Sequence, residues 1–181
     1  CDWSSDVCSS DLLQALLFHE RVHQCGMNCI DYSKEVDENN CFVIVSGGDD
    51  NMFSANIFQI TTINSDVKPS KFEIVKLKSL NLNNFCASAL KGIRLVNNYI
   101  FCAGWNQRMH VGKLKYEISK TNKSVAYVEV DDINFELVGM AFVDVADIGD
   151  LDVNHEIINE TEETFNILVV GQGIEYLKYH H

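Results

Sequence analysis

Residues 41–60 constrain the fold more than any other part of the chain, because two apolar runs flank one short polar segment. The first run extends from Cys41 to Val45, and the second places apolar side chains at alternating positions from Phe53 onward. Alternation with a period of two is typical of a β-strand with one buried face. The SGGDDN segment between the runs combines glycine with Asp and Asn, which favour tight turns. We therefore predict a β-hairpin.

A fixed spacing of residues precedes this hairpin. His23 is followed by apolar side chains four, seven and nine positions later, at Met27, Ile30 and Tyr32. A histidine with this spacing, followed by a Ser-Gly-x-x-Asp turn, resembles a WD repeat, which is one four-stranded blade of a β-propeller.

The resemblance implies a structural role for three polar residues. In WD blades a histidine, a serine on the second strand and the aspartate of the next turn form a buried hydrogen-bonded network. The matching residues are His23, Ser46 and Asp50. Such a network is stable only when each buried polar group has a partner. The tryptophan that usually closes it is absent, because Asn56 occupies its position, as Gly112 does in the next repeat.

The same pattern recurs further along the chain. Cys86 takes the place of His23, and Cys102 and Asn106 take the places of the serine and the turn aspartate, while the apolar spacing is kept. We therefore predict a second blade with a weakened network, held mainly by apolar packing. A weaker third copy precedes a final short hairpin. The chain is thus predicted to be all-β, a partial WD-repeat β-propeller with two blades and most of a third.

The same alternation gives approximate strand positions. Residues 124–133 alternate clearly and are expected to form the outermost strand of the second blade. Residues 154–164 are rich in glutamate and are expected to form a solvated acidic loop. Residues 13–22 are expected to end a strand of a preceding blade. The strands expected in the first blade are residues 27–32, 41–46, 51–60 and 71–80.

Residues 1–12, CDWSSDVCSSDL, read codon for codon as the translation of a common sequencing-library adapter. We interpret them as an artefact rather than native sequence and exclude them from fold reasoning. Residues 13–181 are then expected to be the C-terminal blades of a propeller whose remaining blades are missing. Without the adapter-like residues the formal net charge changes from −12 to −9, and the cysteine count from seven to five.

Composition narrows the class of function. An acidic chain does not favour direct binding to phosphate backbones. The remaining cysteines lie mostly in or beside apolar runs, which indicates reduced, buried thiols in a cytosolic protein. Cys25 and Cys29 would supply only two of the four ligands of a structural metal site. No apolar run approaches the roughly 18 residues of a membrane-spanning helix. We predict a cytoplasmic protein without metal, cofactor or membrane partner.

Two patterns could suggest chemistry. His23, Ser46 and Asp50 have the residue types of a hydrolase triad. Ser46 lacks a Gly-x-Ser-x-Gly elbow, so the structural interpretation is favoured and no catalytic residue is predicted. The Gly171-Gln172-Gly173 segment could suggest a phosphate loop, but the next residues alternate like a strand, which favours a turn.

Several short segments resemble one family more specifically. They are His23-Gln24-Cys25-Gly26, the SGGDDN turn, Asp144-Val145-Ala146-Asp147 and the terminal GQGIEY. Together, residues 19–179 resemble the C-terminal end of the WD repeat-containing protein 6 family. The resemblance implies a non-catalytic partner of the methyltransferase that places a 2′-O-methyl group on the wobble nucleotide of certain tRNAs. The expected partners are that catalytic subunit and, through the complex, tRNA. A general WD-repeat scaffold for trafficking or ubiquitin-ligase assemblies is the alternative.

The WD resemblance also implies partner-contact positions. The residue before the turn aspartate faces the disc surface in WD blades, and here this is Asp49 in one blade and Trp105 in the next. An exposed aromatic side chain at such a position is a candidate hot spot, and Arg108 lies close by in sequence. Packing of Trp105 against a neighbouring loop is the alternative.

Overall fold

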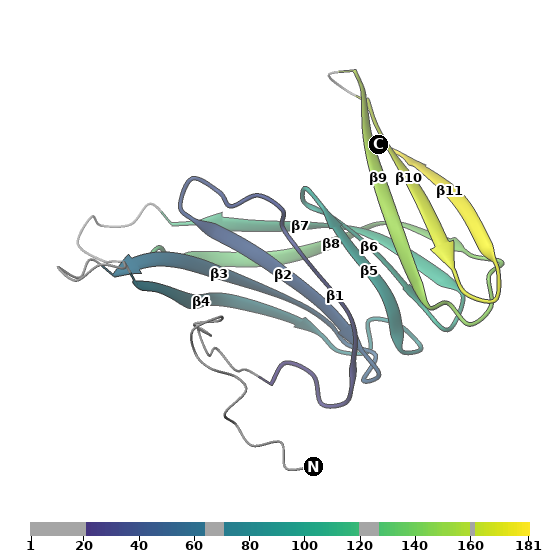
Figure 1. Cartoon of the computed structure of the whole chain (residues 1–181), viewed down its shortest axis with the longest axis horizontal. Coiled ribbons are helices and arrows are strands. Elements are labelled where there is room, and N and C mark those ends of the chain that lie inside the picture. The colour runs from purple at the N-terminus through teal and green to yellow at the C-terminus, as the bar shows by residue number, and fades with distance from the viewer. Residues whose placement is uncertain (1–20, 64–70, 120–126, 160–161) are drawn as a thin grey trace, which may run out of the picture.

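The computed structural model describes residues 21–63, 71–119, 127–159 and 162–181, and these ranges form β-strands joined by turns and loops, with no helix (Figure 1). The expected strand at 13–22 lies mostly outside the described residues, and Arg21 and Val22 are not in a strand. The strands are β1 (Met27–Tyr32), β2 (Cys41–Gly48), β3 (Phe53–Ile63), β4 (Lys71–Leu82), β5 (Leu90–Val96), β6 (Tyr99–Gly104), β7 (Arg108–Ile118), β8 (Val130–Phe142), β9 (Asp150–Asn159), β10 (Glu162–Val170) and β11 (Ile174–His180).

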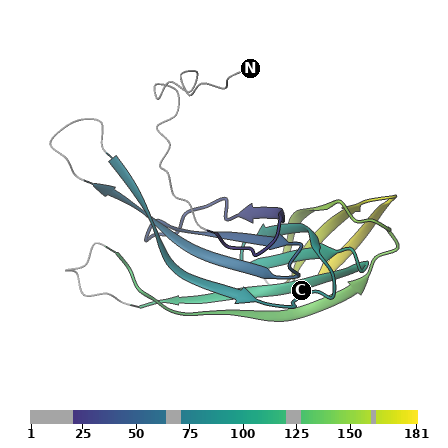
Figure 2. The same ribbon diagram turned by 90° about the horizontal axis from the view of Figure 1, so that it is seen from below.

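The strands form three antiparallel sheets, each made of strands consecutive in sequence. Their orders are β1-β2-β3-β4, β5-β6-β7-β8 and β11-β10-β9. The sheets follow one another in chain order, and the yellow-green third sheet lies at one end of the row (Figures 1 and 2). The first strands of successive sheets are neighbours, with β1 beside β5 and β5 beside β9. The fold is a partial β-propeller with two four-stranded blades and a three-stranded third, as the sequence predicts.

Beta-bulges explain why the outermost strand of the second blade is misplaced by sequence reasoning. The strand expected at 124–133 is right only for its last four residues, because β8 begins at Val130; residues 127–129 are not in a strand, and 124–126 lie outside the described residues. Strand β8 pairs with β7 as far as Phe142, and the register shifts twice, near Gly112 and near Ile118. Each bulge inverts which parity faces the core, so alternation fades over most of the real strand.

The expected acidic loop at 154–164 is also wrong. Strand β9 continues to Asn159, and β10 begins at Glu162, so most of this segment forms the two arms of a hairpin. Glu156, Glu162 and Glu163 lie on the two arms. His155 stacks on the buried Phe165 ring at a centroid distance of 4.7 Å. High charge on an exposed strand resembles a loop in sequence, because only one face of that strand must be apolar.

Two apolar clusters hold the blades together. Phe53, Ile57 and Leu90 belong to the cluster between the first and second sheets. Phe101 and Phe165 belong to the cluster between the second and third sheets. Strand β6 contributes to both clusters and is buried along its whole length, which accounts for its continuous apolar sequence. Burial of one such side chain stabilises the fold by about 1.5–3 kcal/mol.

Gly112 makes room for an aromatic side chain in the first cluster. A Cβ added at Gly112 would lie 1.9 Å from the Phe135 ring. That ring packs on Phe53 and Phe85 at centroid distances of 5.2 and 5.3 Å. The second blade therefore places a phenylalanine from β8 over the position where the repeat pattern usually has tryptophan.

Candidate partner-binding surface

The structure brings His23, Ser46 and Asp50 together in one network. His23 Nδ1 lies 3.0 Å from Asp50 Oδ1, and His23 Nε2 lies 2.9 Å from the Ser46 hydroxyl oxygen. An ionised carboxylate can only accept, so in the neutral imidazole Nδ1–H donates to Asp50 and the Ser46 hydroxyl donates to Nε2. The loop ahead of β1 is thereby attached to β2 and to the turn after it.

Asp50 is the charged end of this network. Its carboxylate also accepts hydrogen bonds from the backbone N–H of Gln24 at 2.9 Å and of Met52 at 3.3 Å. Burial raises the pKa of Asp50, but the hydrogen bonds from His23 and these two amides outweigh it, so the pKa lies below its usual value. The network thus keeps Asp50 ionised and satisfied.

The geometry resembles a hydrolase triad, but Ser46 is poorly placed for nucleophilic attack. Ser46 lies within strand β2 and is only 3% exposed. A nucleophile must approach a substrate carbonyl to about 3 Å, and here the Ser46 hydroxyl is buried against the His23 ring. A Cβ at Gly48 would lie 2.7 Å from Gly26 O and 2.9 Å from His23 Nδ1. The packing favours a structural role for the three residues.

One backbone contact repeats in all three blades. The residue after a close-packed glycine donates its N–H to a carbonyl in the loop that leads into the blade. Asp49 donates to Gly26 O at 2.9 Å, Trp105 to Ala89 O at 3.2 Å, and Gln172 to Ala146 O at 2.8 Å. Asp49, Trp105 and Gln172 are therefore equivalent positions at the same end of their blades.

The preceding glycines explain why the chain can make this contact. A Cβ at Gly48, Gly104 or Gly171 would lie 2.7, 2.9 or 2.5 Å from the carbonyl oxygen that accepts the bond. Contacts this short do not occur for a real Cβ, so only glycine lets the two backbones approach. No Ser-Gly-x-x-Asp turn marks Gln172 in the third blade. The preceding Gly171 is the sequence feature that could have identified this position.

The network of the second blade is replaced rather than only weakened. Cys86 Sγ lies 3.5 Å from His110 Nδ1, and both side chains are buried. Burial raises the pKa of the Cys86 thiol to about 11, and burial, with the Arg108 charge second, lowers the pKa of His110. Both groups are therefore neutral near pH 7. Asn106 Oδ1 is buried without a hydrogen-bond partner among the described residues.

Asp49 and Trp105 are neighbours on the surface, because Lys91 bridges them. The Lys91 ammonium lies 3.1 Å from Asp49 Oδ1 and 4.5 Å from the centre of the Trp105 ring. Asn28 Nδ2 also donates to Asp49 Oδ1 at 2.7 Å, and these two bonds lower the pKa of Asp49. The Trp105 side chain is 58% exposed, so it contacts its own blade but leaves most of its surface to solvent.

Arg108 extends this surface at the other side of the β6–β7 turn. Its guanidinium lies 5.0 Å from the centre of the Phe142 ring, which is 71% exposed. We call Asp49, Lys91, Trp105, Arg108 and Phe142 together the Trp105 surface. Sequence reasoning missed Lys91 and Phe142, because both are placed by strand pairing and blade packing rather than by a motif. The set combines exposed aromatic rings with cations, the composition that is enriched in protein interfaces.

The described residues contain no disulfide, metal-ligand cluster or membrane-spanning helix. Of the five cysteines they include, Cys25 is exposed and the other four are buried, and none forms a disulfide. Within these ranges no cluster of three or more His, Cys, Asp or Glu side chains could hold a metal ion. The same ranges contain no helix with the length and apolar character needed to span a membrane.

No family model matches the chain, and no curated protein matches it either. The class of the protein is therefore defined by its fold and by the contacts that repeat from blade to blade. These are a partial β-propeller built from four-stranded antiparallel blades, with the His23–Ser46–Asp50 network in the first blade.

Proposed function

We propose that the chain is part of a non-catalytic scaffold that binds a protein partner through the Trp105 surface. The observation that carries the proposal is the exposed Trp105 ring, held by Lys91 and by its backbone bond to Ala89 on a rigid turn. An aromatic side chain fixed in this way loses little conformational entropy when a partner covers it. Turns at the ends of propeller blades commonly carry binding residues.

For the partner we propose the catalytic subunit of a tRNA 2′-O-methyltransferase, with the chain helping to position tRNA for methylation of the wobble nucleotide. The support is the resemblance to the WD repeat-containing protein 6 family. Two segments that carry it are far apart in sequence but touch in the fold. Gln172 bonds to Ala146 O through its backbone N–H and to the Asp147 carboxylate through its side chain. The two segments therefore form one contact of the third blade, between the loop at 144–147 and the β10–β11 turn.

The charge balance fits an indirect role toward RNA. The formal net charge, −12 for the whole sequence and −9 without the three aspartates of residues 1–12, disfavours direct binding to phosphates, so we propose that tRNA is held mainly by the partner enzyme. Lys91 and Arg108 place two cations on the Trp105 surface, where they could meet acidic residues of that enzyme. The proposed location is the cytoplasm, a reducing compartment that suits the free thiols.

The proposal is tested by depleting the protein in its own cells and mapping 2′-O-methylation in the tRNA anticodon loop. We expect methylation to be lost at the wobble nucleotide and kept at the other methylated site of the loop. This result would mean that the protein directs a shared enzyme to one nucleotide. Unchanged methylation at both sites would contradict the tRNA proposal. The general WD-repeat scaffold would then take its place, with partners identified by co-purification.

A further inference from the structure

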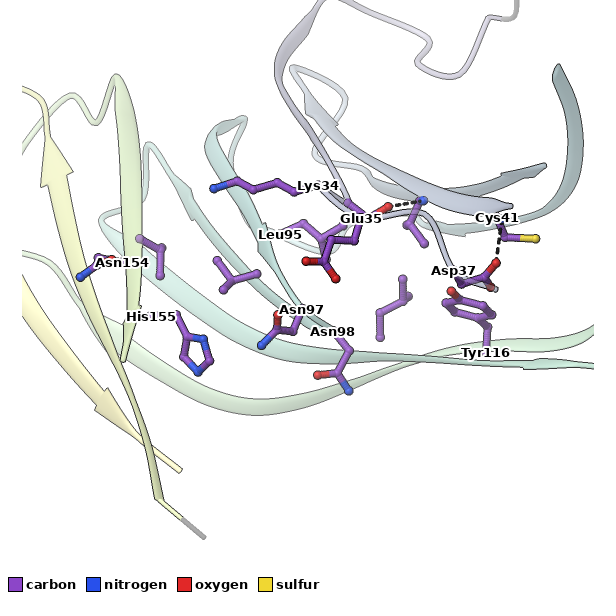
Figure 3. A pocket seen from close by; sticks show the side chains of 15 residues that line it. Lys34, Glu35, Asp37, Cys41, Leu95, Asn97, Asn98, Tyr116, Asn154 and His155 are labelled. Atoms are coloured by element: carbon purple, nitrogen blue, oxygen red, sulfur yellow. Dashed lines mark hydrogen bonds between the residues drawn. The ribbon is translucent and has the colours of Figure 1, made fainter. Parts of the chain in front are cut away.

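A cavity of about 470 Å³ lies at the other end of the blades from the Trp105 surface (Figure 3). Its walls come from all three sheets, namely the β1–β2 loop, the β5–β6 turn with the adjoining part of β7, and strand β9. The inner wall is apolar and includes Val43, Leu95 and Leu114. A pocket with an apolar wall and a few convergent polar groups is the usual form of a binding site.

The polar groups of the cavity include four side chains without internal partners. Glu35, Lys34, Asn97 and Asn98 line it, and within the described residues their side chains have no hydrogen bond or ion pair. Other lining groups are already engaged. Asp37 accepts bonds from the backbone N–H of Asn39 and Cys41 at 2.8 Å. His155 contacts Glu163 at 2.9 Å.

The free groups come from different segments and converge. The Glu35 carboxylate turns toward Asn97 and Asn98, whereas the Lys34 side chain, which also lines the cavity, extends toward Asn154 on β9 (Figure 3). Asn97 holds a left-handed backbone conformation, with φ of 55°, which fixes the tight β5–β6 turn. The cavity therefore presents one carboxylate and two carboxamides beside an apolar wall.

From this arrangement we propose that the cavity binds an arginine side chain carried by an extended segment of a protein partner. A guanidinium offers five N–H donors in a planar fork, which can pair with a carboxylate and with amide oxygens at once. The methylene stem of arginine would pack on Leu95 and Leu114. An anionic ligand is disfavoured, because two carboxylates line the cavity, the free Glu35 and the engaged Asp37, against the single ammonium of Lys34.

This inference goes beyond the proposed function and does not depend on it. The β1–β2 loop and the Asp49 turn lie at opposite ends of strand β2, so the cavity and the Trp105 surface are at opposite ends of the blades. A partner could use either surface alone. Failure of the methylation experiment would therefore leave the arginine site standing, and the reverse also holds.

The test is a titration of the full, isotope-labelled chain with the peptide acetyl-Gly-Arg-Gly-amide, followed by nuclear magnetic resonance. The matched peptide carries citrulline, which keeps the shape of arginine but removes its charge. We expect shifts of the Asn97 and Asn98 side-chain amide signals with the arginine peptide at millimolar concentration. The citrulline peptide should bind at least fivefold more weakly.

Variants assign the contact to named residues. Glu35→Gln should lower the affinity for the arginine peptide at least threefold, and Asn98→Ala should also lower this affinity. Glu117 is exposed on β7 outside the cavity, so Glu117→Gln should leave the affinity for the arginine peptide unchanged. Equal binding of both peptides, an unchanged affinity of Glu35→Gln, or shifts caused by inorganic phosphate and not by the peptide would each overturn the proposal.

Discussion

His23 Nε2 lies 2.9 Å from the hydroxyl oxygen of Ser46, although the two residues are 23 positions apart in sequence. The contact is buried and connects the loop ahead of β1 to the middle of the first blade. Because the opposite side of the imidazole is held by Asp50, the ring has a fixed orientation. The first blade therefore fixes its entry loop with a charged network, where the second blade has the neutral Cys86–His110 pair.

Removal of either partner of this contact should destabilise the protein. We expect His23→Ala and Ser46→Ala each to lower the free energy of unfolding by about 1–3 kcal/mol, because each leaves a buried polar group unpaired. Urea unfolding of the single and double variants measures their coupling. Asn106→Ala in the second blade is the control and should cost less, because its Oδ1 has no partner among the described residues. Additive effects of the His23 and Ser46 variants would contradict a direct interaction.

The network should also make stability depend on pH. The pKa of Asp50 in the folded protein lies below its usual value of 3.8. Its contribution is therefore fully present above pH 4 or so and is lost as the pH falls through the folded pKa. Urea unfolding between about pH 6 and pH 3 should show a steeper loss of stability for the wild type than for Asp50→Asn. If the stability of the two proteins fell in parallel with pH, the ionised Asp50 carboxylate would contribute no stability through its partners.

The three glycines of the repeated backbone contact should resist substitution. We expect Gly48→Ala, Gly104→Ala and Gly171→Ala to destabilise the protein by about 1–3 kcal/mol each, since a Cβ would clash with a backbone carbonyl. Gly173→Ala is the matched control, because a Cβ added at Gly173 would have no other atom within 4 Å. Thermal unfolding compares the four variants. If Gly171→Ala were as stable as Gly173→Ala, the close backbone contact would not be shared by the third blade, which would contradict the repeated contact.

Gly112 should be replaceable only when Phe135 is made smaller. Gly112→Ala alone is expected to cost about 1–3 kcal/mol, because the added methyl group would overlap the Phe135 ring. Combination with Phe135→Leu should recover part of that loss relative to Phe135→Leu alone. Urea unfolding of the four proteins in this cycle measures the coupling, and a coupling energy near zero would contradict the packing described.

Sequence reasoning succeeds where one local rule decides the structure. The β2–β3 hairpin follows from a glycine-rich turn between apolar runs, and the group His23, Ser46 and Asp50 follows from fixed spacing. Prediction from sequence fails where pairing between strands determines the position of an element. The bulges in β7 and β8 hide the alternation of β8, and the glutamates on the β9–β10 hairpin imitate a loop.

The candidate surfaces show the same division. Trp105 is placed by the turn of its own blade, and the repeat pattern predicts that position. Lys91 is 42 residues from Asp49 in sequence, and only the packing of β5 beside β1 brings them together. Cys86 pairs with His110 rather than with the residue at the Ser46 position, because the second blade uses a different strand for its partner. No pattern in either local segment could reveal such contacts.

Trp105 provides the most direct test of the proposed scaffold function. Trp105→Ala should weaken binding of the full chain to the tRNA 2′-O-methyltransferase catalytic subunit at least tenfold, which is the usual effect of losing an aromatic hot spot. The free energy of unfolding of the Trp105→Ala variant should differ from that of the wild type by less than about 1 kcal/mol, because the ring is exposed. Tyr176→Ala is the matched control, since Tyr176 is 57% exposed on the third blade.

The decisive measurement is therefore the affinity of wild type, Trp105→Ala and Tyr176→Ala for that catalytic subunit, measured by calorimetry at one salt concentration. We predict that the Trp105 variant alone loses affinity while its thermal unfolding stays close to that of the wild type. Equal affinity of all three proteins, or no binding by the wild type, would contradict the claim that the Trp105 surface is where this partner binds.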